Sequence, residues 1–343
     1  MKRYIIIYLL ILGNLLAFNS CRKDELDPNS IFIDPPYEGA DPNSYSYELD
    51  RWLYDNFLKP YNIQFRYRLE DVGSYMNYNL VPTTYEKSKD MAVLVKYLWL
   101  DSYVQLMGED FVKTNVPRIF HLVGSPEYNP ANGTEVLGVA EGGLKITLTK
   151  CNELDLDNLK FANEQYFKTI FHEYQHILHQ KKPYPREYNL FSAALYEPFS
   201  WQDRPDKVAR SMGLVSSYAG SSVDEDFVEV IANYIVRSDA DWQLILNQAD
   251  QDWRISVSST GMTQYEKDPI TGETVTACVI DTVSDGIPGK DVILQKLNIC
   301  KNYLRDSWNI DLDSLHAKVQ SRQFNISINM DSLRRQLTDD YLH

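Results

Sequence analysis

The order of the elements predicts an α+β fold, in which a small mixed sheet in the first half precedes a mostly helical second half. Strand-like alternation is confined to residues 63–69, 118–123 and 135–149. Beyond residue 163 the apolar residues recur mainly at helical spacing. Hydrophobic residues make up 44% of the chain and no internal repeat is visible, so we expect one large domain or two closely packed lobes.

The expected helices follow from apolar residues at three- and four-residue intervals. The segment 87–107 is apolar on most sides and is therefore expected to be buried. The segment 163–180 is closed by Pro183 and Pro185. Residues 268–289 carry turn pairs and are expected to form a loop. The helices are predicted at residues 44–58, 87–107, 163–180, 224–236, 242–253, 292–306 and 312–319.

The first twenty residues have the pattern of an export signal. Lys2 and Arg3 precede an apolar run, 4–18, which is shorter than the roughly twenty residues that span a bilayer. The run stops just before Cys21, and this resembles a bacterial lipoprotein signal in which Cys21 carries the lipid. Residues 1–20 are therefore predicted to be a signal peptide, with a plain secretory signal and an incidental cysteine as the alternative.

Residues 21–42 are predicted to be a flexible tether, because they are rich in Pro, Asn and Ser and lack apolar periodicity. The acidic cluster just after Cys21, RKDELD, resembles the surface-export signal of lipoproteins in glycan-importing Gram-negative gut bacteria. We expect an outer-membrane lipoprotein exposed at the cell surface, with the periplasmic face as the alternative. The folded domain is then 43–343, with lobes at about 43–182 and 183–343.

The net charge of −14 argues against nucleic acid as a partner, because nucleic-acid binding needs a basic surface. It also argues against binding an anionic membrane through protein charge, so the lipid on Cys21 is the expected anchor. Beyond that residue, Cys151, Cys278 and Cys300 allow at most one internal disulfide.

The segment TIFHEYQHILHQ holds three of the six histidines of the chain. His172 and His176 form an HExxH motif and lie one helical turn apart on the same face, so both imidazoles can reach one zinc ion at about 2.0–2.1 Å. Glu173 is then placed to act as general base towards water activated by zinc. The alternative is a core helix whose histidines are satisfied by hydrogen bonds.

His179 does not fit as a third ligand beside these two. It lies seven residues beyond His172, a rise of about 10.5 Å, which is too far for one ion. The longer pattern HExxHxxGxxH would need Gly at 179 and His at 182, where the chain has His179 and Lys182. His179 is therefore interpreted as a residue that supports a ligand from behind or packs beside it.

Catalytic zinc normally has three protein ligands, so the third must come from elsewhere. Asp224, Glu225, Asp226 and Glu229 are candidates on the predicted helix at 224–236. Glu225 and Glu229 share a face, whereas the two aspartates point about 100° to either side. A solvated acidic helix N-terminus is the alternative for the first three.

Three segments in this order carry a family resemblance: GVAEGGLKITLTKCNELD, TIFHEYQHILHQ and DEDFVEVIANY. They resemble the substrate import-associated zinc metallohydrolases, which are HExxH lipoproteins, over most of the mature chain. The resemblance implies a gluzincin-type zincin fold with Glu225 as the third zinc ligand and Glu229 supporting a zinc histidine. It also implies that Tyr218, seven residues before Glu225, stabilises the oxyanion, although coincidence is a rival among 24 tyrosines.

This resemblance implies a surface-tethered zinc metallopeptidase that trims peptides or glycoproteins, encoded beside a TonB-dependent importer and its substrate-binding lipoprotein. One alternative is a binding subunit of the importer with little hydrolysis, which the intact Glu173 disfavours. Another is a zinc hydrolase of a non-peptide amide or ester. Residues 144–149 are expected to form an edge strand that binds an extended peptide, with an ordinary sheet strand as the alternative.

Overall fold

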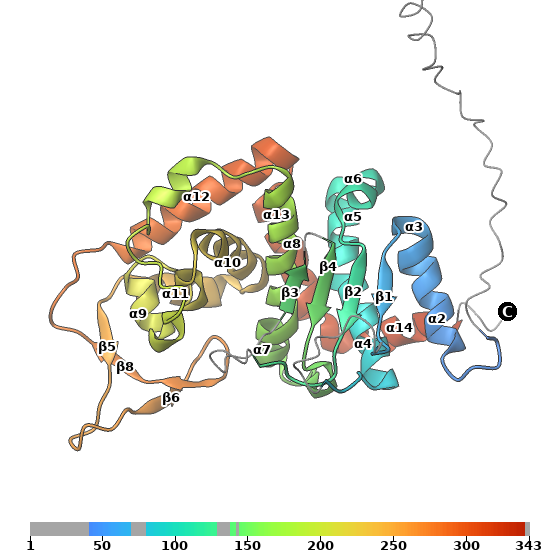
Figure 1. Ribbon diagram of the computed structural model, residues 1–343, viewed down its shortest axis with the longest axis horizontal. Helices are drawn as coiled ribbons and strands as arrows, with labels where there is room; N and C mark the ends of the chain where they lie inside the picture. Colours follow the sequence, from blue (N-terminus) through green and yellow to red (C-terminus); the bar gives the residue numbers. More distant parts are fainter. Residues whose placement is uncertain (1–40, 70–79, 129–137, 142–143, 340–343) are drawn as a thin grey trace, which may run out of the picture. The chain divides into compact units, whose positions relative to one another are not determined.

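The computed structural model describes residues 41–69, 80–128, 138–141 and 144–339 (Figure 1). The described residues from Pro42 onward form one compact unit. The predicted signal peptide, Cys21 and nearly all of the tether lie outside the described residues, so these assignments stay predictions. In the described part of the chain, no helix is both long and apolar enough to cross a membrane.

The first half supplies a four-stranded sheet with the strand order β1-β2-β4-β3. The first three strands in this order run parallel, and β3 runs antiparallel to β4. Phe120 and Ile146 are fully buried and belong to the core of the domain. The strands are β1 (Gln64–Arg66), β2 (Ile119–Leu122), β3 (Gly138–Glu141) and β4 (Lys145–Leu148).

The expectation that residues 144–149 form an edge strand is wrong. Lys145 of β4 pairs with Ile119 on one side and with Glu141 on the other, so β4 is an inner strand. Among the described residues, the outer strands of this sheet are β1 and β3, and β3 is the one beside β4. The sequence shows a single alternating run broken by two glycines, and local alternation does not reveal which half of a hairpin faces outward.

Two interrupted helices pack near the sheet, and both contain π-helical turns. The predicted helix at 87–107 is confirmed as a run of three segments, and Trp99 in its centre is 1% exposed. The Thr84 side chain caps its start by accepting a hydrogen bond from the Lys87 amide. The segments are α2 (Tyr47–Leu53), a π-helical turn (Tyr54–Leu58), α3 (Lys59–Tyr61), α4 (Tyr85–Leu94), a π-helical turn (Val95–Leu100), α5 (Asp101–Met107) and α6 (Glu109–Asn115).

The predicted helix at 163–180 is confirmed as α8 (Lys168–Lys181), which continues α7 (Leu159–Ala162) through a π-helical turn (Asn163–Phe167). It lies between the sheet and α10 (Val223–Val236) and contacts both (Figure 1). Tyr174 is fully buried on its inner side, with ring centroids 5.1 Å from Trp99 and 4.9 Å from Tyr103. Aromatic packing therefore fixes the rotation of α8 and aims its other face at α10.

The second half is mostly helical, as predicted, but the region 253–280 also holds two small antiparallel pairs, β5–β8 and β6–β7. The expectation of a structureless loop at 268–289 is therefore wrong in its first part. A final helix that the sequence did not predict returns to α2 and α4, where Arg334 pairs with Asp90 at 2.7 Å. These elements are α9 (Asp206–Ser211), α11 (Asp239–Ala249), β5 (Trp253–Ile255), β6 (Tyr265–Lys267), β7 (Thr274–Thr276), β8 (Cys278–Ile280), α12 (Gly289–Trp308), α13 (Leu312–Phe324) and α14 (Ile326–Asp339).

Three thiols lie in the interior of the domain. Cys151, Cys278 and Cys300 are each free and buried, so no disulfide links them. Burial raises the pKa of the Cys151 thiol to about 12.

Short 3₁₀ turns join the helices around α8 and α10. These turns are Cys151–Glu153, Arg186–Leu190, Trp201–Asp203 and Tyr218–Gly220.

Candidate metal centre

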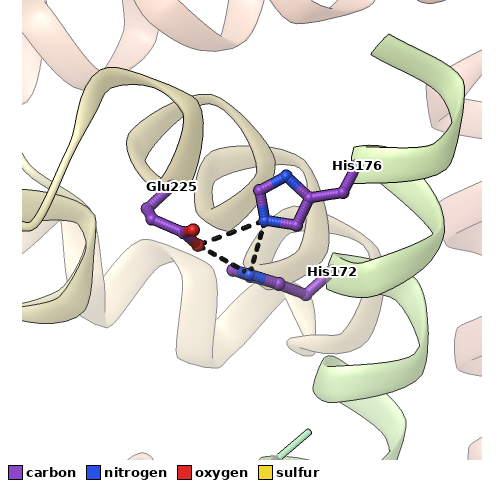
Figure 2. A group of neighbouring side chains, drawn as sticks. All are labelled: His172, His176 and Glu225. Atoms are coloured by element: carbon purple, nitrogen blue, oxygen red, sulfur yellow. Dashed lines mark hydrogen bonds and ion pairs between the residues drawn. The ribbon is translucent and has the colours of Figure 1, made fainter. Parts of the chain in front are cut away.

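Three side chains from α8 and α10 converge on one point (Figure 2). The His172 Nε2 atom lies 2.9 Å from Glu225 Oε2, and His176 Nε2 lies 3.2 Å from the same oxygen. The two Nε2 atoms are 3.2 Å apart. The structure therefore brings together the three residues that the sequence proposed as zinc ligands.

The triangle of donor atoms fits a zinc ion. A circle through the three atoms has a radius of about 1.8 Å, which is shorter than a Zn–N bond of about 2.0–2.1 Å. A point at bonding distance from all three therefore exists, and two imidazoles with one carboxylate are a donor set that zinc accepts in catalytic sites. The site also attracts positive charge. Burial alone would lower the pKa of His172, but the carboxylates of Glu225 and Glu229 raise this pKa to about 10.

Local sequence explains how each ligand is placed. His172 and His176 are four residues apart on α8 and therefore share the face that α10 covers. Glu225 lies in the first turn of α10, where the Ser222 side chain caps the helix by accepting a hydrogen bond from the Glu225 amide. A carboxylate in this turn is favoured by the helix dipole.

Glu229 lies directly behind His172. Its Oε1 atom is 2.9 Å from His172 Nδ1, and its Oε2 atom accepts hydrogen bonds from Ser216 Oγ at 2.6 Å and Asn233 Nδ2 at 3.1 Å. Lys168 Nζ lies 3.7 Å from the same Oε2. Burial alone would raise the pKa of Glu229, but the Lys168 charge and these hydrogen bonds hold it well below its usual range. A carboxylate in this place orients the imidazole and leaves its Nε2 lone pair for a metal.

His179 lies behind His176 in the corresponding place. Its Nε2 atom is 2.9 Å from His176 Nδ1, and its ring packs against Tyr184 and Phe227. Burial and the neighbouring His176 lower the pKa of His179 to about 4. The neutral ring can therefore accept a hydrogen bond from His176 Nδ1–H, which leaves the other nitrogen of His176 facing the centre.

Glu173 and Tyr218 lie in the cleft beside the three ligands. The Tyr218 ring is 5.7 Å from that of His172 and 4.9 Å from that of Trp201. Burial, followed by the nearby charges of Glu225 and Glu173, raises the pKa of Tyr218, so its hydroxyl stays a hydrogen-bond donor. Both residues thus line the same cleft as His172 and Glu225, and their predicted catalytic roles stay predictions.

The remaining acidic candidates lie elsewhere. Asp226 is fully buried and pairs with Lys296 Nζ at 2.5 Å, which ties α10 to α12. Asp224 accepts a hydrogen bond from the Tyr184 hydroxyl. Their positions agree with the expected rotation to either side of Glu225.

Sequence reasoning missed the groups that hold Glu229. Lys168 stands four residues before His172, and Asn233 four residues after Glu229, so helical spacing alone could have placed both on the faces that meet. Ser216 comes from the segment before α10, and no local pattern indicates its contact.

The metal point opens into a cleft of about 860 Å³. One wall is a single face of the helix that contains the motif, from Glu164 through Lys168 to His172. The second wall contains Trp201 and Tyr218, and the third is formed by the β6–β7 hairpin. The volume is in the range of sites that enclose part of a substrate.

An HExxH helix against a small mixed sheet, with a glutamate from a later helix at the same point, defines a mixed α/β protein of the zinc-metallopeptidase class. Residues 43–313 match the family described as "Putative zinc-binding metallo-peptidase", and the chain belongs to this zinc-binding family.

A solved relative has the same fold. The crystal structure of a "putative zinc-binding metallo-peptidase" from Bacteroides caccae ATCC 43185 matches with 35% sequence identity and a TM-score of 0.62. The match covers 84% of this chain and 96% of that one. No protein of curated function matches the chain.

Proposed function

We propose that the protein is a zinc-dependent peptidase that hydrolyses peptide bonds in the cleft beside α8. The observation that carries the proposal is the convergence of His172, His176 and Glu225 within bonding reach of one point, with Glu173 adjacent. Zinc held by these three residues would supply Lewis-acid activation of a water molecule and of the scissile carbonyl group.

The side chains around the centre have separate tasks in this reaction. Glu173 accepts the proton of the attacking water and returns it to the leaving amine. Tyr218, whose raised pKa keeps its hydroxyl protonated, donates a hydrogen bond to the oxyanion. Glu229 and His179 hold the two imidazoles so that each presents Nε2 to the centre.

A peptide is the substrate best suited to the surroundings of the centre. The strand β3 contacts α8 and is one of the two outer strands of the sheet among the described residues. An extended chain can hydrogen-bond to an outer strand through its own backbone, whatever its side chains are. We therefore propose that the peptide substrate pairs with β3 as an added strand. This is the role first expected of residues 144–149.

Replacing Glu173 by Gln tests the proposal. The amide keeps the shape of the side chain but cannot accept the proton, so zinc content should stay unchanged while kcat/KM falls by about 10²–10⁴-fold. Cleavage is measured on denatured proteins by mass spectrometry, and zinc by elemental analysis. Glu187→Gln, an exposed substitution of the same type, is the control. Zinc binding without any cleavage that depends on Glu173 would favour a binding subunit instead.

The cellular setting is part of the same proposal. We infer an outer-membrane lipoprotein, anchored through Cys21 and facing the cell surface, that trims peptides or glycoproteins for a TonB-dependent importer. The support is the signal-like N-terminus and the tether composition of residues 21–42. Cys21→Ser should move the protein from the membrane fraction to the soluble fraction, and retention in the membrane would contradict the lipid anchor.

A further inference from the structure

The β6–β7 hairpin forms one wall of the metal cleft, although it follows the HExxH motif by about ninety residues of sequence. We call residues 265–276 the hairpin wall. Its strands pair Tyr265 with Thr276 and Lys267 with Thr274. Figure 1 shows the hairpin extending from the β5–β8 pair towards α7, which leads into the start of α8.

The tip of the hairpin wall is fastened to the body of the domain. Ile270 is 1% exposed and belongs to the main hydrophobic core. Asp268 Oδ1 accepts hydrogen bonds from the amides of Ile270 at 2.6 Å and Thr271 at 3.1 Å, which shapes the turn. Lys160 Nζ, on α7, donates to the Pro269 carbonyl at 2.5 Å. The tip therefore reaches the helix that leads into α8.

The base of the hairpin wall is fastened on the opposite side. Glu266 Oε1 pairs with Lys207 Nζ of α9 at 2.7 Å and accepts a hydrogen bond from the Cys278 amide at 3.3 Å. The Lys207 ammonium also lies 4.9 Å from the centroid of the Trp253 ring. Because both ends are attached, the hairpin spans the space between α9 and α7 as a fixed element.

The length of the cleft on this side is set by the helix that lines it. Glu164 and His172 both line it and are eight residues apart, which corresponds to about 12 Å of helix. Lys160, which holds the tip, lies one further turn back. An extended peptide advances by about 3.3 Å per residue, so this part of the cleft accepts about four residues.

We propose that the hairpin wall closes one end of the cleft, so that the enzyme cleaves short peptides and chain ends instead of bonds in the middle of long chains. On the closed side, the substrate has at most about four residues beyond the cleaved bond. This inference rests on the proposed peptidase function and specifies its substrate class.

The chemistry of the closed end suits a chain terminus. Glu164 with Lys168 on the helical wall, and Glu266 with Lys207 at the base of the hairpin wall, are ion pairs that line this part of the cleft. A charged terminus keeps polar partners in such surroundings, whereas an apolar lining would impose a desolvation cost on it.

The test compares peptides of about five and about twenty residues, mapping the cleaved bonds by mass spectrometry with Glu173→Gln as the blank. The native enzyme should cut within about four residues of one end, and always the same end. In the main variant, Asn-Gly replaces residues 268–273. This two-residue turn suits the Lys267–Thr274 register and removes the contact with α7. It should raise the ratio of kcat/KM on the long peptide to kcat/KM on the short peptide by about tenfold or more.

Two further variants guard against misfolding. Lys160→Ala removes the hydrogen bond to Pro269 but keeps Ile270 in the core, and should shift the cleavage sites in the same direction to a smaller extent. Met262→Ser, in an exposed turn that does not line the cleft, should leave the cleavage map unchanged.

Each outcome is decisive. If cleavage depends on Glu173 but the native enzyme cuts bonds far from both ends, the inference is overturned and the peptidase function stands. An unchanged cleavage map in the folded Asn-Gly variant also overturns it. If no peptide is cut in a Glu173-dependent way, the proposed function fails, and the inference fails with it.

Discussion

Replacing Glu229 by Gln probes how the centre keeps His172 ready for a metal. In the structure the carboxylate divides its partners: Oε1 faces His172 Nδ1, while Oε2 faces Ser216, Asn233 and Lys168. Glutamine has the same shape, but one of its two terminal groups is now a donor. Its orientation is therefore decided by which side tolerates an NH₂ group.

The side facing Asn233 and Lys168 does not tolerate it, because both of those groups are donors. Each unsatisfied buried donor costs about 1–3 kcal/mol, so the amide oxygen should stay on that side. The NH₂ group then faces His172 Nδ1 and forces this nitrogen to accept. The ring proton moves to Nε2, which is the atom that points at the metal. Zinc affinity should fall by about 10–100-fold, equivalent to about 1.4–2.7 kcal/mol.

Competition with a chromophoric chelator at pH 7.5 measures this change, and unfolding in urea with the metal removed checks that the fold is intact. Glu229→Ala is the informative comparison, because it removes the partner without imposing the wrong tautomer. It should bind zinc more weakly than the native protein but no more weakly than Glu229→Gln. Native-like affinity in Glu229→Gln would contradict this role of the His172 tautomer, and so would a much larger loss in Glu229→Ala.

Three other substitutions have defined outcomes. Glu225→Ala should lose zinc altogether in the chelator assay; tight binding there, with loss in the Glu229 variants, would mean that the ligand has been misassigned. Tyr218→Phe should keep zinc and lower kcat by about 10²–10³-fold, and a loss within about threefold would remove its role. The third substitution concerns Glu164. Burial alone would raise the pKa of its carboxyl group, but the charges of Arg237 and Lys168 lower this pKa from 4.5 to about 2. This stabilisation is complete above about pH 4.5 and is lost as the pH falls towards 2. Glu164→Gln should therefore reduce the free energy of unfolding at pH 7 by about 3 kcal/mol, with the gap closing in acid, as followed by urea unfolding without metal.

Spacing within each helix was sufficient to predict which candidate ligands share a face. His172 and His176 share a face by their four-residue interval, and so do Glu225 and Glu229. The meeting of the two helices and the choice of Glu225 over Glu229 as ligand needed a further argument, and the family resemblance supplied both. The structure agrees, since α8 and α10 pack directly together.

Long-range contacts were beyond the same reasoning. The sequence shows that residues 135–149 alternate, but the inner position of β4 depends on its pairing with β2, about twenty-six residues earlier. Local sequence predicts a turn-rich loop for most of the hairpin wall, because Ile270 is a single apolar residue among polar ones. Only the tertiary structure shows that this side chain is buried in the core and that the turn around it limits the cleft.

The ion pairs behind the centre resolve a conflict in its electrostatics. A carboxylate behind a metal-bound imidazole orients it well, but its negative charge also cancels part of the pull that a cation exerts on a carbonyl oxygen. Here the two buried carboxylates of Glu164 and Glu229 are matched by the two cations of Lys168 and Arg237. The four charges sum to zero within the protein interior, where an unmatched charge would act strongly on its neighbours. Among the described residues, Glu225 is the one carboxylate in the candidate donor set, so a divalent cation held by the three proposed ligands would keep one net positive charge. The orienting effect of Glu229 is thus retained while the centre stays electrophilic.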